Sequence, residues 1–356
     1  MKEITFLRTI KRHRQQIGEL KSPLVLADGV QITQPSSNVR LYRHNSTIGD
    51  PLLSTIYFLP GTAFVAREES FTDVICSHIC ANSECQVLCI KHELAPEVKF
   101  PNGHLDAYKI LKKTLELTAS YNVDKTKMAI VGYSSGGNFA ALITAMAGKD
   151  GLNFNRQVLI SPCLDLSRHC SKFKDFENQD TAITEQFVTW FLNHYVPEGT
   201  KREDPRISPV WEDIANLKKL PPTDIIVATY DRFRGDSEIY AEKLQKAAIA
   251  ITKYEVPKED HSFLWNRIDI SEFIGLKIKY ALATPSLSLS PENCLLSSKL
   301  IFWHPQTNKS TAGKQFVTSK NNKVITLTNK ELSKLLAALF VNLPTNYSRI
   351  PYCHRN

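Results

Sequence analysis

One short motif restricts the fold of this chain more than any other feature. The segment Gly132-Tyr133-Ser134-Ser135-Gly136 follows a strand-like apolar run at 128–131 and precedes a helical run of small residues at 138–146. Glycines two positions before and two positions after Ser134 allow the backbone to turn sharply between the strand and the helix. Such a turn lifts the serine hydroxyl above a sheet edge, close to the positive end of the helix. The motif therefore predicts an α/β protein with a nucleophilic serine.

Segments typical of strands alternate with segments typical of helices along the first 284 residues. Hydrophobic residues make up 42% of the 356 positions and charged residues 22%, as in ordinary globular proteins with a full core. Strands separated by helices form βαβ units, so we expect an α/β fold with a mostly parallel sheet and helices on both faces. The predicted strands cover 56–59, 86–90, 128–131, 157–161, 224–228 and 252–256, and the predicted helices cover 104–119, 138–146, 237–248 and 271–282.

Two further residues complete the arrangement that a nucleophilic serine needs. Asp231 follows the strand at 224–228, and His261 follows the strand at 252–256. A serine needs a base, and that base needs an orienting carboxylate, in the chain order Ser, Asp, His for this architecture. Alone, His261 could be a surface histidine and Asp231 a helix cap. Because all three residues come after parallel strands, we expect them at one sheet edge.

Six segments, in order, resemble the hormone-sensitive-lipase branch of the α/β-hydrolase superfamily. That branch carries RLAPE-x-x-FP, GDSAGGN, SP-x-LDLS, DP-x-x-SP, D-x-L-R-D and HGF. The resemblance covers about residues 40–280. The matching segments are ELAPE at 93–97 with FP at 100–101, GYSSGGN at 132–138, SPCLDLS at 161–167, DPRISP at 204–209, YDRFR at 230–234 and HSF at 261–263.

The resemblance implies an α/β-hydrolase fold and a carboxylic-ester hydrolase. It assigns the nucleophile to Ser134, the base to His261 and the orienting carboxylate to Asp231. It also implies a helical cap, built from N-terminal helices at 1–35 and from an insert at about 166–218 within a catalytic domain at 36–284. A substrate pocket would be lined by Phe64, Tyr133, Trp190 and Phe191, although the helix at 185–196 could equally serve core packing.

One motif departs from the family pattern. Where the family has HGGG, this chain has Pro60-Gly61-Thr62-Ala63. The family's second and third glycines donate backbone N–H groups to the oxyanion, so the resemblance assigns the oxyanion hole to Thr62, Ala63 and Ser135. A β-branched threonine does not take positive φ cheaply, so we expect the loop to follow a different path.

The sequence thus predicts an esterase that acts on short-to-medium acyl esters through an acyl-enzyme, without a cofactor. The alternative is a ligand-binding or weakly active protein on the same scaffold, as in the plant gibberellin receptors, which resemble the family but lack the catalytic histidine. His261 argues against this alternative, whereas the altered oxyanion motif supports it. A homodimer is one assembly that the sequence leaves open.

Four cysteines lie close together, at Cys76, Cys80, Cys85 and Cys89. With His78 among them they invite a zinc interpretation, but no CxxC pair is present. Helical spacing of the first two, and a strand between the last two, favour small core residues instead. Free thiols, no apolar run of ~18 residues and no signal-like N-terminus favour a cytoplasmic protein without a membrane span.

The basic charge is concentrated in the last 65 residues. The chain carries a net charge of +8, of which residues 292–356 hold +7. An uncharged Ser/Pro stretch at 285–291 predicts a linker before this basic extension. Inside the extension we expect a hairpin from 316–319 and 324–327 and a helix at 332–341. For this extension, a solvated basic surface is favoured over a nucleic-acid-binding role. Weak contact of the extension with anionic surfaces is an alternative that the sequence leaves open.

Overall fold

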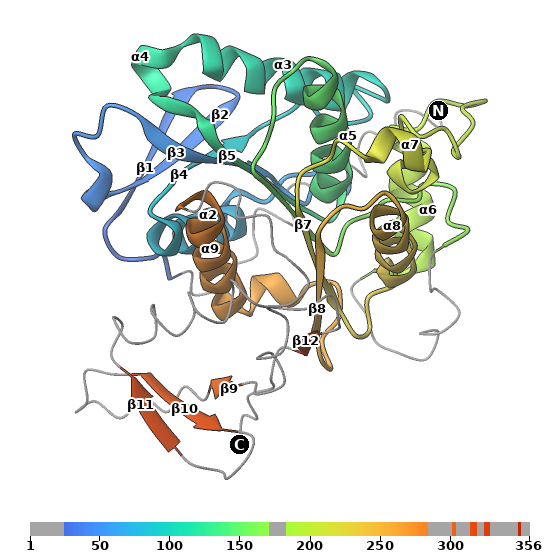
Figure 1. Cartoon of the computed structure of the whole chain (residues 1–356). Coiled ribbons are helices and arrows are strands. Elements are labelled where there is room, and N and C mark those ends of the chain that lie inside the picture. Colours follow the sequence, from blue (N-terminus) through green and yellow to red (C-terminus); the bar gives the residue numbers. More distant parts are fainter. Residues whose placement is uncertain are drawn as a thin grey trace.

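The computed structural model describes residues 25–170 and 183–283, together with the backbone of four short strands near the C-terminus. The described residues form a nine-stranded sheet in the order β1-β2-β4-β3-β5-β6-β7-β8-β12 (Figure 1). Its strands are β1 (Val30–Ser36), β2 (Val39–His44), β3 (Leu53–Leu59), β4 (Gln86–Ile90), β5 (Val123–Tyr133), β6 (Arg156–Ile160), β7 (Thr223–Ala228), β8 (Ile251–Val256) and β12 (Ser348–Arg349).

Most of the sheet is parallel, as the βαβ pattern predicts. Strand β2 runs antiparallel to both β1 and β4, and every pairing from β4 to β12 is parallel. The inner strands β3, β4 and β7 are buried along nearly their whole length. Strands that are buried to this extent need cover on both faces.

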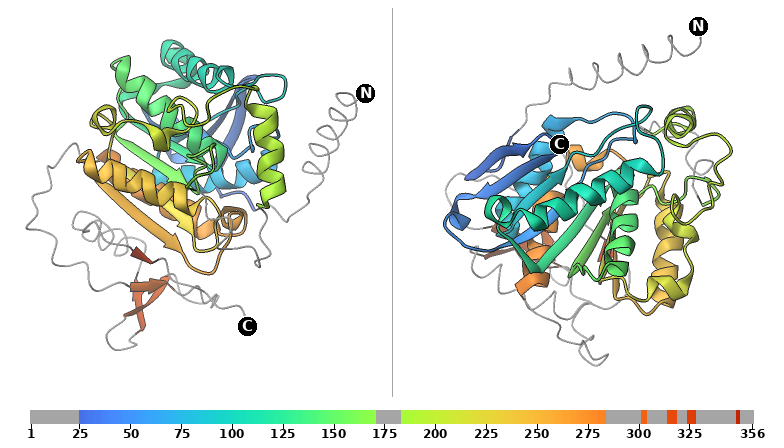
Figure 2. Two further views of the ribbon diagram at one scale, coloured as in Figure 1. Left: turned by 90° about the vertical axis from the view of Figure 1, so that its right-hand side faces the viewer. Right: turned by 90° about the horizontal axis from the view of Figure 1, so that it is seen from above.

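Helices supply that cover on both faces (Figures 1 and 2). Alternate residues of β3 point to opposite faces and therefore join two separate cores. The described helices are α2 (Glu69–Ser83), α3 (Asn102–Glu116), α4 (Thr118–Tyr121), α5 (Ser135–Lys149), α6 (Glu185–Tyr195), α7 (Ile214–Leu217), α8 (Arg234–Lys246) and α9 (Ile268–Ala283). Ile56 and Phe58 pack with α2 and α9, whereas Tyr57 and Leu59 pack with α3, α5 and α8.

The predicted insert lies between β6 and β7. Within its described part it contains α6, α7 and a short 3-10 helix, Pro209–Trp211. The expected helix at 185–196 is therefore confirmed as α6. Residues 171–182 of the predicted cap lie outside the described residues.

The N-terminal part of the prediction needs a correction. Residues 1–24 lie outside the described residues, and 30–35, which were expected to be helical, belong to edge strand β1. Residues 30, 32 and 33 are β-branched and pair with β2, and Gly29 at φ 73° turns the chain into the strand. Only Val30 and Ile32 of β1 are partly buried, so it carries too weak an apolar pattern to be recognised.

The expected hairpin of the C-terminal extension is confirmed. Strands β10 (Lys314–Thr318) and β11 (Val324–Leu327) pair antiparallel, and β9 (Ile301–Trp303) adds a third strand. The helix expected at 332–341 lies outside the described residues. Where the chain is described, none of its helices combines the length and the apolar character needed to cross a membrane.

Candidate active site

The turn between β5 and α5 holds Ser134 in an unusual conformation. Its backbone angles are φ 56° and ψ −120°, a region that residues with a side chain rarely occupy. The flanking glycines make this possible, because a Cβ on Gly132 would lie 2.2 Å from the Gly136 carbonyl oxygen and a Cβ on Gly136 2.0 Å from that of Leu59. Ser134 is consequently held at the N-terminus of α5, as the motif predicts.

His261 and Asp231 meet Ser134 at this edge of the sheet. Ser134 Oγ lies 2.8 Å from His261 Nε2, and His261 Nδ1 lies 3.1 Å from each carboxylate oxygen of Asp231. Asp231 is fully buried and accepts a further hydrogen bond from the Phe233 N–H at 2.9 Å. The carboxylate thus favours the tautomer in which Nδ1 carries the proton, and Nε2 can accept one from the serine.

Aromatic rings hold the imidazole in place. The ring of Tyr133 stacks on His261 with centroids 5.6 Å apart, and Phe233 packs against it edge-on at 5.3 Å. The Tyr133 hydroxyl donates to the His261 carbonyl oxygen at 2.8 Å. Burial, and then the charge of Asp231, raise the pKa of Tyr133 well above its usual value, so this hydroxyl stays protonated as a donor. Tyr133, which the sequence placed in the pocket, therefore supports the histidine.

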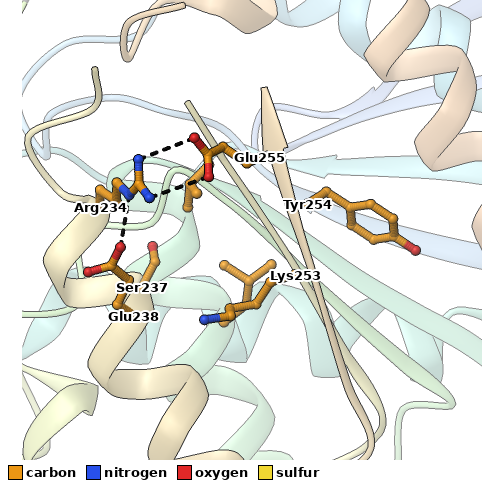
Figure 3. Close-up of a pocket in the computed structure, with 8 residues that line it drawn as sticks. Arg234, Ser237, Glu238, Lys253, Tyr254 and Glu255 are labelled. Carbon is orange, nitrogen blue, oxygen red and sulfur yellow. Dashed lines mark hydrogen bonds and ion pairs between the residues drawn. The ribbon is translucent and has the colours of Figure 1, made fainter. Parts of the chain in front are cut away.

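The turn that carries Asp231 is fastened to the neighbouring strand through Arg234 (Figure 3). Its guanidinium binds Glu238 at 2.8 Å on its own helix and both carboxylate oxygens of Glu255 on β8 at 3.3 Å. Glu255 also accepts a hydrogen bond of 2.9 Å from the Thr229 hydroxyl. Arg234, Glu238 and Glu255 line a small pocket beside α8. The hydrogen bonds from Thr229 and Arg234 to Glu255 tie both ends of the β7–α8 turn to β8. Sequence reasoning missed them because Glu255 lies more than 20 positions from both Thr229 and Arg234.

The loop at residues 60–64, called the oxyanion loop after its expected role, contains two residues with positive φ. Positive φ falls at Ala63 (44°) and Phe64 (62°), whereas Thr62 avoids it. The Thr62 N–H donates to the Ser135 hydroxyl oxygen at 2.9 Å. Within the described ranges the N–H groups of Ala63 and Ser135 have no acceptor. Two of the three expected donors are thus available to a ligand, and the third is occupied by a side chain.

An aromatic cluster lies directly behind this loop. Phe64 stacks on Tyr195 with centroids 4.1 Å apart and contacts Phe139 at 5.7 Å and Phe191 at 5.9 Å. Trp190 contacts Phe187 and His194 on its own helix and packs, partly buried, against the core that contains Phe64 and Phe191. Tyr195 was not among the predicted lining residues. It lies one helical turn after Phe191, and this spacing is a sequence signal that could have found it.

The cysteine cluster belongs to the core. The four thiols are free and their residues at most 2% exposed, in the core beneath α2 and α9. Burial raises the pKa of Cys80 and of Cys85 to about 12, which keeps both thiols neutral. Over the described residues, no three His, Cys, Asp or Glu side chains form a group that could hold a metal ion.

Known proteins share this arrangement of elements. A family model described as the alpha/beta hydrolase fold matches residues 56–265. A putative alpha/beta hydrolase of Acanthamoeba polyphaga mimivirus is 26% identical over 60% of this chain and 61% of that protein. The arylesterase of Saccharolobus solfataricus is 28% identical over 70% of this chain and 83% of that protein. Among solved structures, an ester hydrolase from the metagenome of Lake Arreo is 26% identical with a TM-score of 0.68, covering 78% of this chain and 91% of that one.

Proposed function

Because the chain belongs to the α/β-hydrolase family of hormone-sensitive-lipase-like carboxylesterases, we propose that it hydrolyses carboxylic esters through an acyl-enzyme on Ser134. The single observation that carries this proposal is the continuous hydrogen-bonded series Ser134–His261–Asp231. It lies at the end of the strained turn before α5, where a nucleophile is best exposed to a substrate.

In the first half of the reaction, Ser134 Oγ attacks the ester carbonyl carbon while His261 Nε2 takes the serine proton. Asp231 accepts the Nδ1–H and stabilises the imidazolium that forms. The carbonyl oxygen becomes an oxyanion close to the free N–H groups of Ala63 and Ser135 and to the positive end of α5. His261 then returns the proton to the departing alkoxide, which leaves as an alcohol.

In the second half, His261 takes a proton from water, and the resulting hydroxide equivalent attacks the acyl carbon. Collapse of the new tetrahedral species releases the carboxylic acid and restores the Ser134 hydroxyl with a proton from His261. The aromatic cluster behind the oxyanion loop supports apolar substrates, and we propose esters with short-to-medium acyl chains. The buried neutral thiols fit a reducing compartment such as the cytoplasm.

A fluorophosphonate probe and a series of p-nitrophenyl esters of increasing acyl length test this function. We expect labelling at one serine, and turnover that disappears in Ser134→Ala. His261→Ala and Asp231→Asn should each lower kcat by orders of magnitude, without adding to the effect of Ser134→Ala, because the three residues act as a unit. Full labelling of the alanine variant would show that another residue is the nucleophile.

The altered oxyanion loop favours a second candidate, a ligand-binding protein with residual activity. The specific observation is that the Thr62 N–H is already bound by Ser135. A binding protein would retain an apolar ester without cleaving it and would label poorly. Rapid labelling together with multiple turnovers would exclude this candidate.

A further inference from the structure

Two buried hydroxyl groups meet beside Ser134 and are not assigned in the mechanism above. Thr62 Oγ1 lies 3.2 Å from Ser135 Oγ, and we call these two groups the hydroxyl pair. Thr62 is 3% exposed and Ser135 1% exposed. The pair therefore lies in a dry part of the site, where each polar hydrogen needs an acceptor.

Each oxygen of the hydroxyl pair already accepts a backbone N–H. Ser135 Oγ accepts from Thr62 at 2.9 Å, and Thr62 Oγ1 accepts from Phe64 at 3.2 Å. The two hydroxyls carry two protons, and only one of them can lie between the two oxygens. One hydroxyl proton is therefore left over, and no third acceptor for the pair exists among the described residues.

We infer that this remaining proton is a side-chain donor to the oxyanion and replaces the Thr62 N–H in that role. Ser135 is the residue that carries it, because Ser135 directly follows the nucleophile and its own N–H has no acceptor among the described residues. The Thr62 hydroxyl then donates to Ser135 Oγ, and every hydrogen of the pair has an acceptor once the oxyanion forms. The inference rests on the proposed esterase function.

The chemistry of the pair suits this task. A hydroxyl that accepts hydrogen bonds from an N–H and from a second hydroxyl is polarised, so its own O–H becomes a stronger donor. A hydroxyl also rotates about its C–O bond and can follow a moving charge, whereas a backbone N–H is fixed by φ and ψ. The pair thus explains how a loop with threonine in place of glycine keeps three donors while Thr62 avoids positive φ.

Replacement of Ser135 by alanine tests whether the third donor is the Ser135 hydroxyl or the Thr62 N–H. If the hydroxyl is the third donor, Ser135→Ala should lower kcat on p-nitrophenyl acetate by roughly 10- to 1,000-fold and leave KM nearly unchanged, since the oxyanion exists only in the transition state. Inhibition by a phenylboronic acid, which forms a tetrahedral adduct on serine, should weaken in parallel. A kcat that is unchanged or raised would overturn the inference, because it would mean that the freed Thr62 N–H acts directly.

A second pair of variants decides the question if Ser135→Ala does not fold. Thr62→Ser keeps the hydroxyl and Thr62→Val removes it at nearly equal size. We expect Thr62→Val to turn over at least roughly tenfold more slowly than Thr62→Ser, and equal rates would overturn the inference. Thr126→Val, which removes an exposed hydroxyl that binds only Asp124, is the matched control and should behave like the wild type.

Assays of the wild-type protein distinguish failure of the proposed function from failure of the hydroxyl-donor inference. Absence of labelling and turnover in the wild type would contradict the proposed function itself. A wild type that labels and turns over, combined with a fully active Ser135→Ala, would contradict the hydroxyl donor alone.

Discussion

Ser134 has a positive φ of 56°, which a β-carbon makes unfavourable. The surrounding turn must hold the residue there, since the Ser134 N–H bonds to the Ile160 carbonyl oxygen at 2.9 Å and the Ser134 carbonyl oxygen accepts from Cys163 at 3.1 Å. The proposed nucleophile thus stores strain that the rest of the fold offsets.

Removal of this β-carbon should release the strain. We expect Ser134→Gly to be more stable than Ser134→Ala by about 1 kcal/mol, although both variants are inactive. The free energy of unfolding in urea, measured for both, tests this. Equal stabilities, or a less stable glycine variant, would mean that the turn is relaxed.

A second residue makes the protein sensitive to acid. His92 follows β4, is 2% exposed, and packs its ring on Phe139 at 4.5 Å. Burial, together with the positive charge of Arg67, lowers the pKa of His92 from 6.5 to about 3. Between these values the unfolded chain binds a proton that the folded chain excludes. Stability therefore falls as the pH decreases below 6.5, by about 1.4 kcal/mol per pH unit for this one group.

His92→Asn should weaken this acid sensitivity. The amide can still donate to the Glu93 carbonyl oxygen, which lies 2.7 Å from His92 Nδ1, but it has no proton to gain. Urea denaturation at pH 7 and at pH 5 should show a loss of stability about 2 kcal/mol smaller than in the wild type. Replacement of the exposed His169 by asparagine is the control, and an equal effect there would exclude burial as the cause.

The sequence was enough to predict which residues meet in the triad, but not which residues meet in the hydroxyl pair. Chain order and strand ends were enough to predict that Ser134, Asp231 and His261 meet. The bond between Thr62 and Ser135 joins positions 73 residues apart and depends on how the loop places positive φ. No local pattern encodes that path.

Helix α5 depends on the size of one residue in its first turn. A Cβ on Gly136 would lie 2.0 Å from the Leu59 carbonyl oxygen and 2.5 Å from that of Pro60, and both are backbone atoms that cannot rotate away. We expect Gly136→Ala to lose about 3 kcal/mol or more of stability and to lose activity, because the end of β3 and the oxyanion loop must move. Thermal unfolding and labelling of the purified variant test this.

Gly148 on the same helix is the matched control. A Cβ there meets nothing within 4 Å, so Gly148→Ala should keep full activity and gain up to about 1 kcal/mol from the better helix former. If both alanine variants behaved alike, close packing under α5 would not explain the role of Gly136.

In the nine-stranded sheet, strands β3 to β8 were predicted from the sequence, whereas β1, β2 and β12 were not. Strand β4 has the predicted bounds, and all five of its residues are buried. Strand β2 mixes buried and half-buried positions, and β1 is mainly exposed, so neither shows the apolar run that marks an inner strand. The N-terminal boundary of the fold was wrong for this reason.

The whole sheet extends beyond the predicted catalytic domain. Strand β12 pairs with β8 at Tyr254 and Glu255, so residues near the C-terminus cover the last strand that the βαβ pattern predicts. The basic extension therefore contributes to the sheet edge as well as to the charge.

Truncation after Pro291 should leave the hydrolysis of small esters largely unchanged. All three residues of the proposed triad precede this position, and β12 contributes only two residues to the sheet. We expect a small decrease in melting temperature and weaker binding to anionic vesicles, because +7 of the +8 net charge is removed. A truncated protein that is folded but inactive would show that the extension completes the site.

The separation of the triad along the chain has a consequence for folding kinetics. Ser134 and His261 are 127 residues apart, and His261 and Asp231 are 30 apart, so the site forms only after long loops have closed. Helices form within microseconds, whereas such non-local pairings are slow. During refolding, the circular dichroism signal of the helices should recover first and ester turnover last. The recovery of ester turnover therefore reports the last step of sheet assembly, in which three turns that are distant in the sequence come together at one edge.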